Sequence, residues 1–271
     1  MSSSVRNSIL LALSLSVSFA IGSVAAAATC GNDGSGYNRW KQDFAAEAAA
    51  VGVGQRGLQA LAASSYSQRT INADRNQRGV RYPLDEFIRI RLGSLDGFAA
   101  QVKRRIDGNP AFYASLEQAY GVPAGILLAI HGMETGFGSN MGSENVINSI
   151  LTVAYDCRRS DLFTPHAVAA LIMVDRGMLS TSQIGAFHGE LGHTQFLPGN
   201  ALRYGVDANG DGTIDFNNLA DSLASTANYL RQKGWQPGQP FNEGTLNFRV
   251  LNEWNAATVY QQAIALVAAR V

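Results

Sequence analysis

The decisive stretch of this chain is Gly121-Val-Pro-Ala-Gly-Ile-Leu-Leu-Ala-Ile-His-Gly-Met-Glu-Thr-Gly-Phe-Gly138. Pro123 suits the first turn of a helix, and Gly136 and Gly138 are typical of the end of one. Glu134 lies one turn before the second of these glycines and continues the apolar face of the predicted helix. That face is formed by apolar residues at helical spacing, namely Ile126, Leu127, Ile130 and Met133.

The position of Glu134 favours a protonated carboxyl group. A carboxylate on an apolar surface is poorly solvated, and the C-terminal end of a helix carries partial negative charge. Both effects raise the pKa of the carboxyl group, and a raised pKa suits a general acid that works near neutral pH. The alternative is a solvated glutamate beside the apolar face, and periodicity alone leaves both interpretations open.

Residues 129–138, A-I-H-G-M-E-T-G-F-G, resemble the catalytic signature of the lytic murein transglycosylase B family, whose usual form is A-I-W-G-x-E-T-x-F-G. The glutamate of that signature is the acid and base of the reaction, so the resemblance implies that Glu134 is catalytic. It also implies a mainly α fold. The expected core is lysozyme-like, similar to goose lysozyme, with helical N- and C-terminal extensions and a small irregular or β segment.

Helical periodicity and helix breakers predict helices along most of the chain, and no long alternating strand is found. The polar segment 64–81 is instead expected to be a loop with short extended pieces. No repeat or low-complexity linker divides the chain, so we expect one catalytic unit over 29–271, with a core at about 109–235 and flanks at 36–108 and 245–271. The expected helices cover 37–50, 55–63, 83–91, 95–105, 109–120, 145–155, 164–176, 222–233 and 260–270.

Residues 1–28 have the features of a secretory signal peptide. They contain one positive charge at Arg6, an apolar run over 9–21 and small residues up to Ala28. No other stretch approaches the ~20 apolar residues that a membrane-spanning helix needs. We therefore expect an exported, periplasmic protein that is soluble or loosely associated with the membrane. Cys30 is not preceded by the residues of a lipobox, so a lipoprotein is not expected.

Cys30 and Cys157 are the two cysteines of the chain. In an oxidising compartment two cysteines most simply form one disulfide, which would pin the N-terminal segment to the core. Two buried free thiols are the alternative.

The charge composition excludes some classes of partner. Lys and Arg total 21, as do Asp and Glu, and removal of Arg6 with the signal peptide leaves 20 against 21, a net charge of −1. This balance gives no indication of nucleic-acid binding. Charged residues make up 15% of the chain, below the ~25% usual in globular proteins, which suits a neutral ligand rich in hydroxyl groups.

A second segment with site features is 185–198, called here the Gly-rich segment. It is too rich in glycine for a helix interior and resembles the family's G-x-x-A-G-E-x-G-Q-T-Q-F-x-P stretch. The resemblance implies that Gln195 contacts an N-acetylated sugar, whereas the residues alone also allow a structural turn with an exposed glutamine. Phe196 is expected to stack on a sugar or to belong to the core. Glu190 is the rival to Glu134, but we expect it to form hydrogen bonds within the loop.

The resemblance assigns further residues to substrate binding. Tyr229, in the A-N-Y-L motif, would line the cleft, with a core tyrosine as the alternative. Trp254 and Asn255 are similar to an aromatic-Asn motif of the family and would position the sugars. Arg158 and Arg159 are expected to meet carboxylates of the peptide stems.

Residues 207–221, called here the Asp-rich loop, resemble a calcium loop. Oxygen-bearing residues alternate from Asp207, and Gly212 occupies the position where an EF-hand turns sharply. The twelfth residue is Asn218 instead of the usual glutamate, so Asp221 would close the site. We expect a structural Ca²⁺ or Na⁺, with a self-contained Asx turn as the alternative. The expected ligands are Asp207, Asn209, Asp211, the carbonyl of Thr213, and Asp221.

The resemblance implies a lytic transglycosylase of cell-wall turnover. Such an enzyme cleaves the β-1,4 bond between MurNAc and GlcNAc of peptidoglycan, forms 1,6-anhydroMurNAc ends and needs no cofactor for the chemistry. The expected partners are glycan strands and other cell-wall enzymes, and the protein is expected to be a monomer. The alternatives are a lysozyme-like hydrolase and a non-catalytic module that binds murein or calcium. The sequence departs from the family pattern at His131, Ala186 and His193.

Overall fold

The computed structural model describes residues 28–77 and 82–271. The predicted signal peptide lies outside the described residues except for Ala28. The mainly α fold is confirmed, because thirteen α-helices account for most of the described chain. Their bounds are α1 Tyr37–Ala50, α2 Gln55–Ala63, α3 Gln68–Asn76, α4 Leu84–Arg91, α5 Leu95–Gly108, α6 Pro110–Tyr120, α7 Ala124–Thr135, α8 Val146–Tyr155, α9 Ser160–Asp175, α10 Pro198–Tyr204, α11 Leu219–Gln232, α12 Leu246–Trp254 and α13 Thr258–Ala268.

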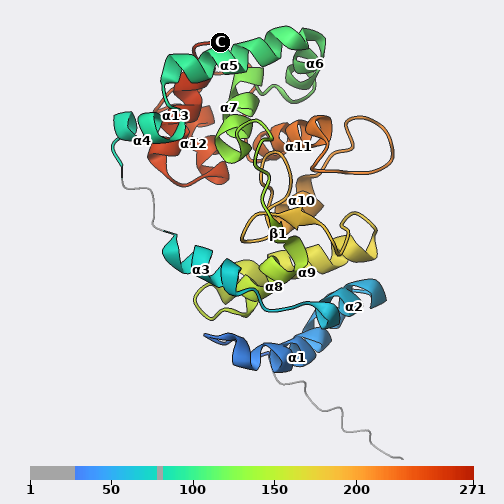
Figure 1. Ribbon diagram of the computed structural model, residues 1–271. Helices are drawn as coiled ribbons and strands as arrows, with labels where there is room; N and C mark the ends of the chain where they lie inside the picture. Colours follow the sequence, from blue (N-terminus) through green and yellow to red (C-terminus); the bar gives the residue numbers. More distant parts are fainter. Residues whose placement is uncertain (1–27, 78–81) are drawn as a thin grey trace, which may run out of the picture.

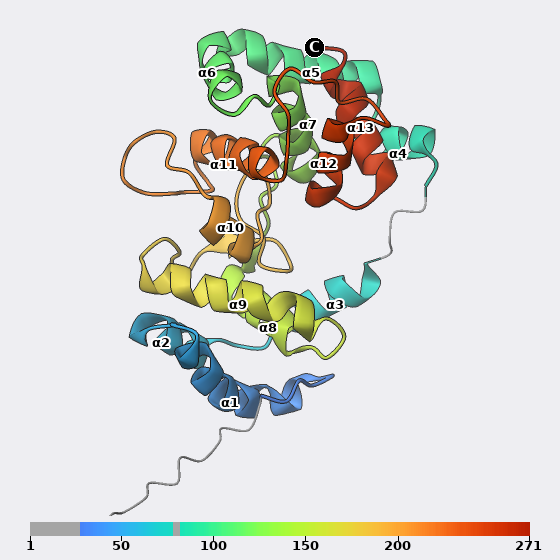
Figure 2. The ribbon, with the colours of Figure 1, turned by 180° about the vertical axis from the view of Figure 1, so that it is seen from behind.

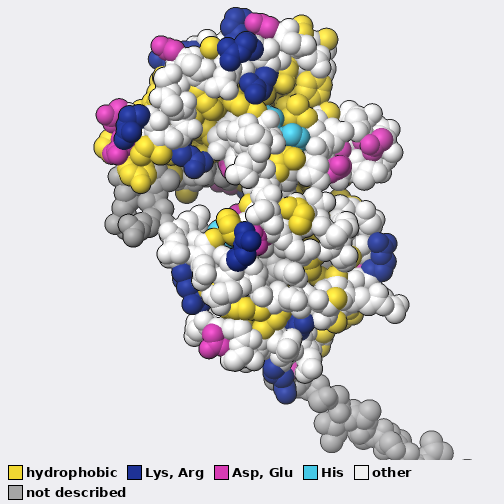
Figure 3. All heavy atoms as spheres, viewed as in Figure 1, with side chains coloured by type: hydrophobic (Ala, Val, Ile, Leu, Met, Phe, Trp, Pro, Cys, Tyr) yellow, Lys and Arg dark blue, Asp and Glu magenta, His cyan; other side chains and the backbone are white. Residues whose placement is uncertain are grey.

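The helices form two groups (Figures 1 and 2). The lower group contains α1, α2, α3, α8 and α9, and the upper group contains α4 to α7 with α12 and α13. Helix α11 packs on α6, α7 and α12 of the upper group, and α10 lies between the groups, since it packs on α9 below and on α11 above. On the face shown in Figure 3, the surface is hollowed between the two groups. Among the described residues, no helix has the length and apolar character required to span a membrane.

Helix α7 is the centre of the upper group. The sequence predicted one apolar face, but every residue of α7 except Glu134 is buried, because α5, α6, α11 and α13 pack around it. A β-carbon on Gly125 would lie 2.7 Å from Val271 Cγ2 and 3.1 Å from Ala268 Cα, so glycine allows the end of α13 to approach closely. The helix ends where Gly136 adopts the left-handed conformation, with φ 58°.

The lower group is joined to the N-terminal segment by a disulfide. Cys30 and Cys157 are bonded across 127 residues of sequence, which confirms the predicted pair over two free thiols. Beside the disulfide, Gly31 pairs with Asp156 in a parallel bridge. Tyr37, Trp40 and Phe44 of α1 then pack as aromatic rings under α8.

Two short strands form the predicted small β segment. β1 (Glu144–Asn145) pairs antiparallel with β2 (Ile184–Gly185), and these strands connect the loop after α7 to the Gly-rich segment. The prediction of a loop over 64–81 was wrong for its middle part, because Gln68–Asn76 form α3. Thr70, Ile71 and Asp74 of α3 are buried at helical spacing, but the polar character of two of them concealed the pattern.

Candidate active site

Glu134 is the penultimate residue of α7 and is half-buried. One carboxyl oxygen, Oε1, accepts two hydrogen bonds from other helices. Trp254 Nε1, at the end of α12, donates at 3.1 Å, and the hydroxyl of Tyr260, in α13, donates at 2.6 Å. The side chain is therefore held by three helices that the core packing brings together.

The surroundings of Glu134 raise its pKa. Burial is the largest influence and favours the neutral acid, while the hydrogen bonds from Tyr260 and Trp254 and the positive charge of Arg91 oppose it. The charge of Glu190 adds to the upward shift. Burial prevails, so the pKa of Glu134 lies above its usual value, as the sequence predicted. The raised pKa favours the protonated form that a general acid needs, and the carboxylate left after proton donation is stabilised by its two donors.

Glu134 lines a pocket with four of the predicted substrate-binding residues, Gln195, Phe196, Tyr229 and Trp254. These residues belong to the Gly-rich segment, α11 and α12, so the pocket is lined by segments that are distant in sequence. Leu197, Asn200 and Glu253 complete its lining.

Gln195 has an uncommon backbone conformation. Its φ of 56° lies in the left-handed region, where residues other than glycine are rare. The conformation is stabilised by the antiparallel bridge between Leu191 and Phe196 and by the side-chain amide, which donates to the carbonyl of Gly192 at 2.8 Å. Backbone strain of this kind often occurs at functional sites because it aims a side chain at a ligand.

The aromatic residues of the pocket are mostly core. Phe196 is 2% exposed and Tyr229 is 4% exposed, although both border the pocket. The edges and faces of Phe196, Tyr229 and Trp254 pack against one another, with ring centroids 5.4 to 6.1 Å apart. The hydroxyl of Tyr229 donates to the carbonyl of Glu253 at 2.6 Å, which anchors the last turn of α12. Both rings therefore hold the half-buried Trp254 against Glu134.

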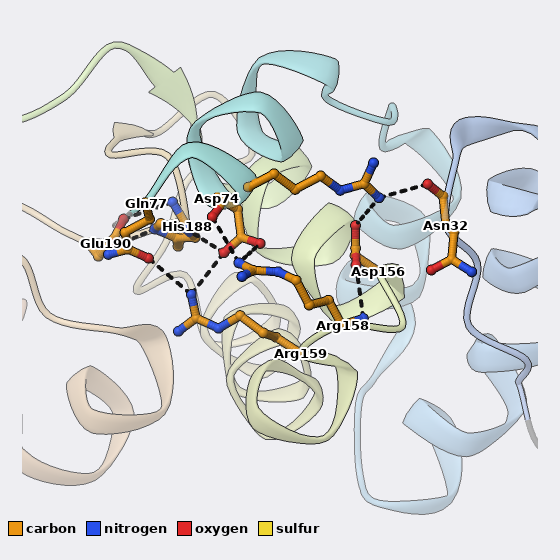
Figure 4. Close-up of polar contacts among 9 residues, drawn as sticks. Asn32, Asp74, Gln77, Asp156, Arg158, Arg159, His188 and Glu190 are labelled. Atoms are coloured by element: carbon orange, nitrogen blue, oxygen red, sulfur yellow. Dashed lines mark hydrogen bonds and ion pairs between the residues drawn. The ribbon is translucent and has the colours of Figure 1, made fainter. Parts of the chain in front are cut away.

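Three other predicted substrate-binding residues do not line this pocket. Asn255 Oδ1 accepts a hydrogen bond from the N–H of Ala257 and shapes the turn between α12 and α13. Arg158 and Arg159 both bind the carboxylate of Asp74, which lies on α3 (Figure 4). Their side chains remain 45% and 29% exposed, respectively.

The Asp-rich loop is closed by its own backbone. Asp207 accepts hydrogen bonds from the N–H groups of Gly210, Asp211 and Gly212, while Asp211 accepts one from Thr213. Asp221 is fully buried, and its two oxygens accept from the N–H groups of residues 208, 209 and 215. Within the described residues no three acidic, histidine or cysteine side chains gather as metal ligands. These hydrogen bonds give the loop the conformation of an Asx turn.

Sequence reasoning missed two residues that act on Glu134. Tyr260 was expected only as the first residue of the last helix, and no short-range pattern connects it with a residue 126 positions earlier. Arg91 donates to the carbonyl of Met133 at 3.0 Å and brings its charge close to Glu134. The expected hydrogen bonds of Glu190 within its loop are present, since it accepts from the backbone N–H of His188 at 2.9 Å.

Residues 36–245 match the family model described as the transglycosylase SLT domain. The chain belongs to this family. Its lysozyme-like fold is shared with solved lytic transglycosylases. SltB3 from Pseudomonas aeruginosa, solved in complex with NAG-anhNAM-pentapeptide, is 27% identical with a TM-score of 0.76, and the match covers 86% of this chain and 78% of SltB3.

A curated sequence and a solved structure from Escherichia coli are also similar to this SLT family member. Membrane-bound lytic murein transglycosylase B is 34% identical over 123 residues, which are 45% of this chain and 34% of that protein, so the alignment spans about a third of the relative. Slt35, solved in complex with calcium, is 20% identical with a TM-score of 0.75, and the match covers 90% of this chain and 95% of Slt35. At that identity the likeness to Slt35 concerns the fold.

Proposed function

We propose that this SLT family member is a lytic transglycosylase. It cleaves the β-1,4 bond between MurNAc and GlcNAc in peptidoglycan and leaves 1,6-anhydroMurNAc ends. The observation that carries the proposal is a single carboxyl group with a raised pKa, Glu134, which lines a pocket and receives two hydrogen bonds on one oxygen. The complex of the relative SltB3 with an anhydro-sugar peptide supports the same product class.

One carboxyl group is sufficient for this reaction because the substrate supplies the nucleophile. Protonated Glu134 gives its proton to the bridging oxygen, the bond from that oxygen to C1 of MurNAc breaks, and GlcNAc leaves with a hydroxyl group. The acetamido carbonyl of MurNAc stabilises the positive charge at C1. The Glu134 carboxylate then takes the proton of the MurNAc 6-hydroxyl while O6 bonds to C1. Glu134 ends protonated, and no water is consumed.

The other residues around the pocket are proposed to stabilise the Glu134 carboxylate or to bind the sugars. Tyr260 and Trp254 stabilise the carboxylate that forms when Glu134 loses its proton. Gln195 is proposed to bind the N-acetyl group of a sugar, because an amide offers both a donor and an acceptor. Trp254 is proposed to stack on a sugar ring, supported by Phe196 and Tyr229.

Residues outside the pocket lining are proposed to meet more distant parts of the substrate. Arg158 and Arg159 are partly exposed, and each guanidinium has N–H donors beyond those that bind Asp74, so they can bind peptide carboxylates. Asn255, beside Trp254, is proposed to orient the sugar that stacks there.

The decisive test is the chemistry of the cleaved ends. Purified peptidoglycan is digested with the wild-type protein, with Glu134→Gln and with Glu117→Gln, a control that changes an exposed glutamate of α6. Mass spectrometry is expected to show anhydro ends for the wild type and the control, and no cleavage for Glu134→Gln. Reducing ends would instead identify a hydrolase. An unchanged effect of Glu134→Gln on cell walls would identify a binding module.

We further propose that the protein is exported to the periplasm, acts as a monomer and works beside other cell-wall enzymes. The disulfide between Cys30 and Cys157 supports an oxidising compartment, since structural disulfides persist there. Cys30 uses its sulfur in this bond, which argues against a thioether-linked lipid on the same residue.

A structural Ca²⁺ or Na⁺ in the Asp-rich loop stays a proposal. The alternating oxygen ligands and the complex of Slt35 with calcium support it, and one oxygen each of Asp207 and Asp221 accepts a single N–H and keeps a lone pair for a cation. Because Asn218 replaces the bidentate glutamate of the twelfth position, we expect weak binding, with a calcium Kd of about 10⁻⁴ to 10⁻³ M. Isothermal titration calorimetry with Ca²⁺ measures it, with Asp211→Asn as the variant that should lose binding. No heat from the wild type at millimolar Ca²⁺ leaves the self-contained turn as the correct interpretation.

A further inference from the structure

His188 lies between two carboxylates, in the turn formed by residues 186–190 of the Gly-rich segment (Figure 4). Its Nδ1 is 3.0 Å from Glu190 Oε1, and its Nε2 is 3.1 Å from Asp74 Oδ1. The ring also stacks on Phe163 of α9, with the two planes 4° apart. Because the imidazole is buried, both of its nitrogens must be satisfied inside the protein.

This arrangement favours an imidazolium. A neutral imidazole has one N–H and one lone pair, whereas His188 faces an oxygen acceptor at each nitrogen. Burial raises the pKa of Asp74, but the hydrogen bonds from Arg158 and Arg159 prevail and keep it below the usual value. Burial also opposes a charge on His188, but its hydrogen bond to Glu190 and the two negative charges raise its pKa above the usual value.

The charged groups that face His188 come from each element packed around it. Asp74 projects from α3, Glu190 from the same loop as His188, and Arg159 from the N-terminal end of α9, where its positive charge opposes protonation. Arg158 reaches the same carboxylate of Asp74 from the neighbouring position. The two negative charges in direct contact with the ring outweigh the more distant guanidinium groups.

The backbone connects this cluster to the pocket. Glu190 precedes Leu191, which exchanges two backbone hydrogen bonds with Phe196, at 2.8 and 3.1 Å. Gln195 lies inside this bridge, in its left-handed conformation, and lines the pocket with Glu134. The turn itself is closed by the N–H of Ala186, which donates to the carbonyl of Glu190 at 3.1 Å. A shift of the turn at residues 186–190 is therefore passed to Gln195.

We propose that His188 is a positioning residue whose imidazolium, bridging Asp74 and Glu190, fixes the Gly-rich segment so that Gln195 meets the sugar. This proposal rests on the function proposed above. Deprotonation leaves a ring lone pair against a carboxylate oxygen, so the turn rearranges and substrate binding weakens. Since the pKa is raised, the stabilisation is complete below the pKa of an unfolded histidine, about 6.5, and is lost as the pH rises through the pKa in the folded protein.

The kinetic test separates KM from kcat across roughly pH 5 to 9, a range that spans the titration of histidine. With soluble glycan strands as substrate, the wild type should show KM rising about tenfold on the alkaline side, with no matching step in kcat. His188→Gln should have the high KM at every pH. Asp74→Asn should move the rise to lower pH, because one of the two carboxylates that favour the imidazolium is neutralised. His166→Gln is the matched control, since this half-buried histidine accepts a hydrogen bond from Gly199 instead.

A rise in KM that survives unchanged in His188→Gln, or a loss confined to kcat, overturns the proposal. So does a fall in kcat for Glu190→Gln as large as that for Glu134→Gln, because Glu190 would then be catalytic. Thermal unfolding of each variant shows whether it is folded under the assay conditions.

A spectroscopic test needs no variant and no activity. Nitrogen-15 NMR of the wild-type protein should show both ring nitrogens of His188 protonated at neutral pH, with a midpoint above about 6.5. A His188 ring that carries one proton at pH 7 overturns the proposal. If the wild type cleaves no glycan but His188 titrates as expected, the proposed function fails while the charge assignment of His188 stands.

Discussion

The hydroxyl of Tyr260 tests whether the protonation of Glu134 controls the reaction. Tyr260→Phe removes one of the two donors to Glu134 Oε1 and changes the buried volume very little. A hydrogen bond to a charged group contributes about 1.5–3 kcal/mol and one to a neutral group about 0.5–1.5 kcal/mol. The ionised form of Glu134 should therefore lose about 1–1.5 kcal/mol more than the acid, which corresponds to about one pKa unit.

Two effects of Tyr260→Phe are expected in the pH profile of kcat. Glu134 must be protonated to donate, so kcat falls as the pH rises through its pKa in the substrate complex, and this alkaline limb should move up by about one pH unit. The plateau should fall by about five- to tenfold, because the carboxylate formed in the transition state has lost a donor. The profile of kcat is the appropriate one, since the effect proposed for His188 acts on KM.

The assay is the rate of anhydro-end formation on soluble glycan strands, measured at saturating substrate. Tyr113→Phe is the control, because this buried tyrosine of α6 packs on Phe112 instead of donating to Glu134. An alkaline limb of Tyr260→Phe that coincides with the wild type would refute the reasoning, and a limb displaced to lower pH would reverse the sign of the interaction.

Two further predictions concern stability. Burial raises the pKa of Glu134. The folded protein therefore loses stability as the pH rises from the unfolded pKa of this group, about 4.3, to its folded pKa, and it loses none below the unfolded pKa. Glu134→Gln should therefore raise the Tm by about 2–4 °C at pH 7, as calorimetry can measure; the gain should fade near pH 4, and a lower Tm at pH 7 contradicts it. Removal of the disulfide in the Cys30→Ser/Cys157→Ser double variant should cost about 2–5 kcal/mol in urea unfolding. Reductant should then lower the wild-type midpoint and leave the variant unchanged, and equal midpoints without reductant would show that the disulfide carries no stability.

The helices were predictable where local signals are strong. The bounds of α1 and α2 agree with the sequence prediction, because glycines interrupt the apolar pattern between them. Helix α7 was predicted from Pro123 in its first turn and from the glycines after Glu134. Pro123 instead precedes the helix as its N-cap, with ψ 141°, whereas Gly136 ends the helix as predicted. Such signals act within a few residues of the chain, so no knowledge of the tertiary contacts was needed.

Long-range compensation explains what the sequence could not predict. Helix α3 buries Asp74, which a hydrophobic pattern treats as a surface residue; the burial is stable because two arginines and His188, all from distant segments, satisfy the carboxylate. Arg158 and Arg159, which were predicted as ligands of the substrate, therefore also bind a carboxylate inside the protein, that of Asp74. The role of Tyr260 could not be predicted from the sequence, because it depends on the contact of α13 with α7, which packing alone determines.

The two histidines that depart from the family pattern form a contact with each other. His131, on α7, and His193, in the Gly-rich segment, contact one another, with Nε2 of the first 3.0 Å from Nδ1 of the second. Burial lowers both pKa values, that of His131 to about 3, so the contact is a hydrogen bond between neutral rings. Nδ1 of His131 is buried with no partner among the described residues, and a bare lone pair there is less costly than a bare N–H. His131 therefore donates from Nε2, and His193 accepts at Nδ1.

A neutral pair at this point has a consequence for the pH dependence. It joins the catalytic helix to the Gly-rich segment three residues before Glu134 in the sequence, yet it carries no charge that could vary near neutral pH. His166 is also held neutral, because burial lowers its pKa. Of the four histidines in the chain, only His188 has a raised pKa. The pH profile should therefore report two groups, Glu134 through kcat and His188 through KM.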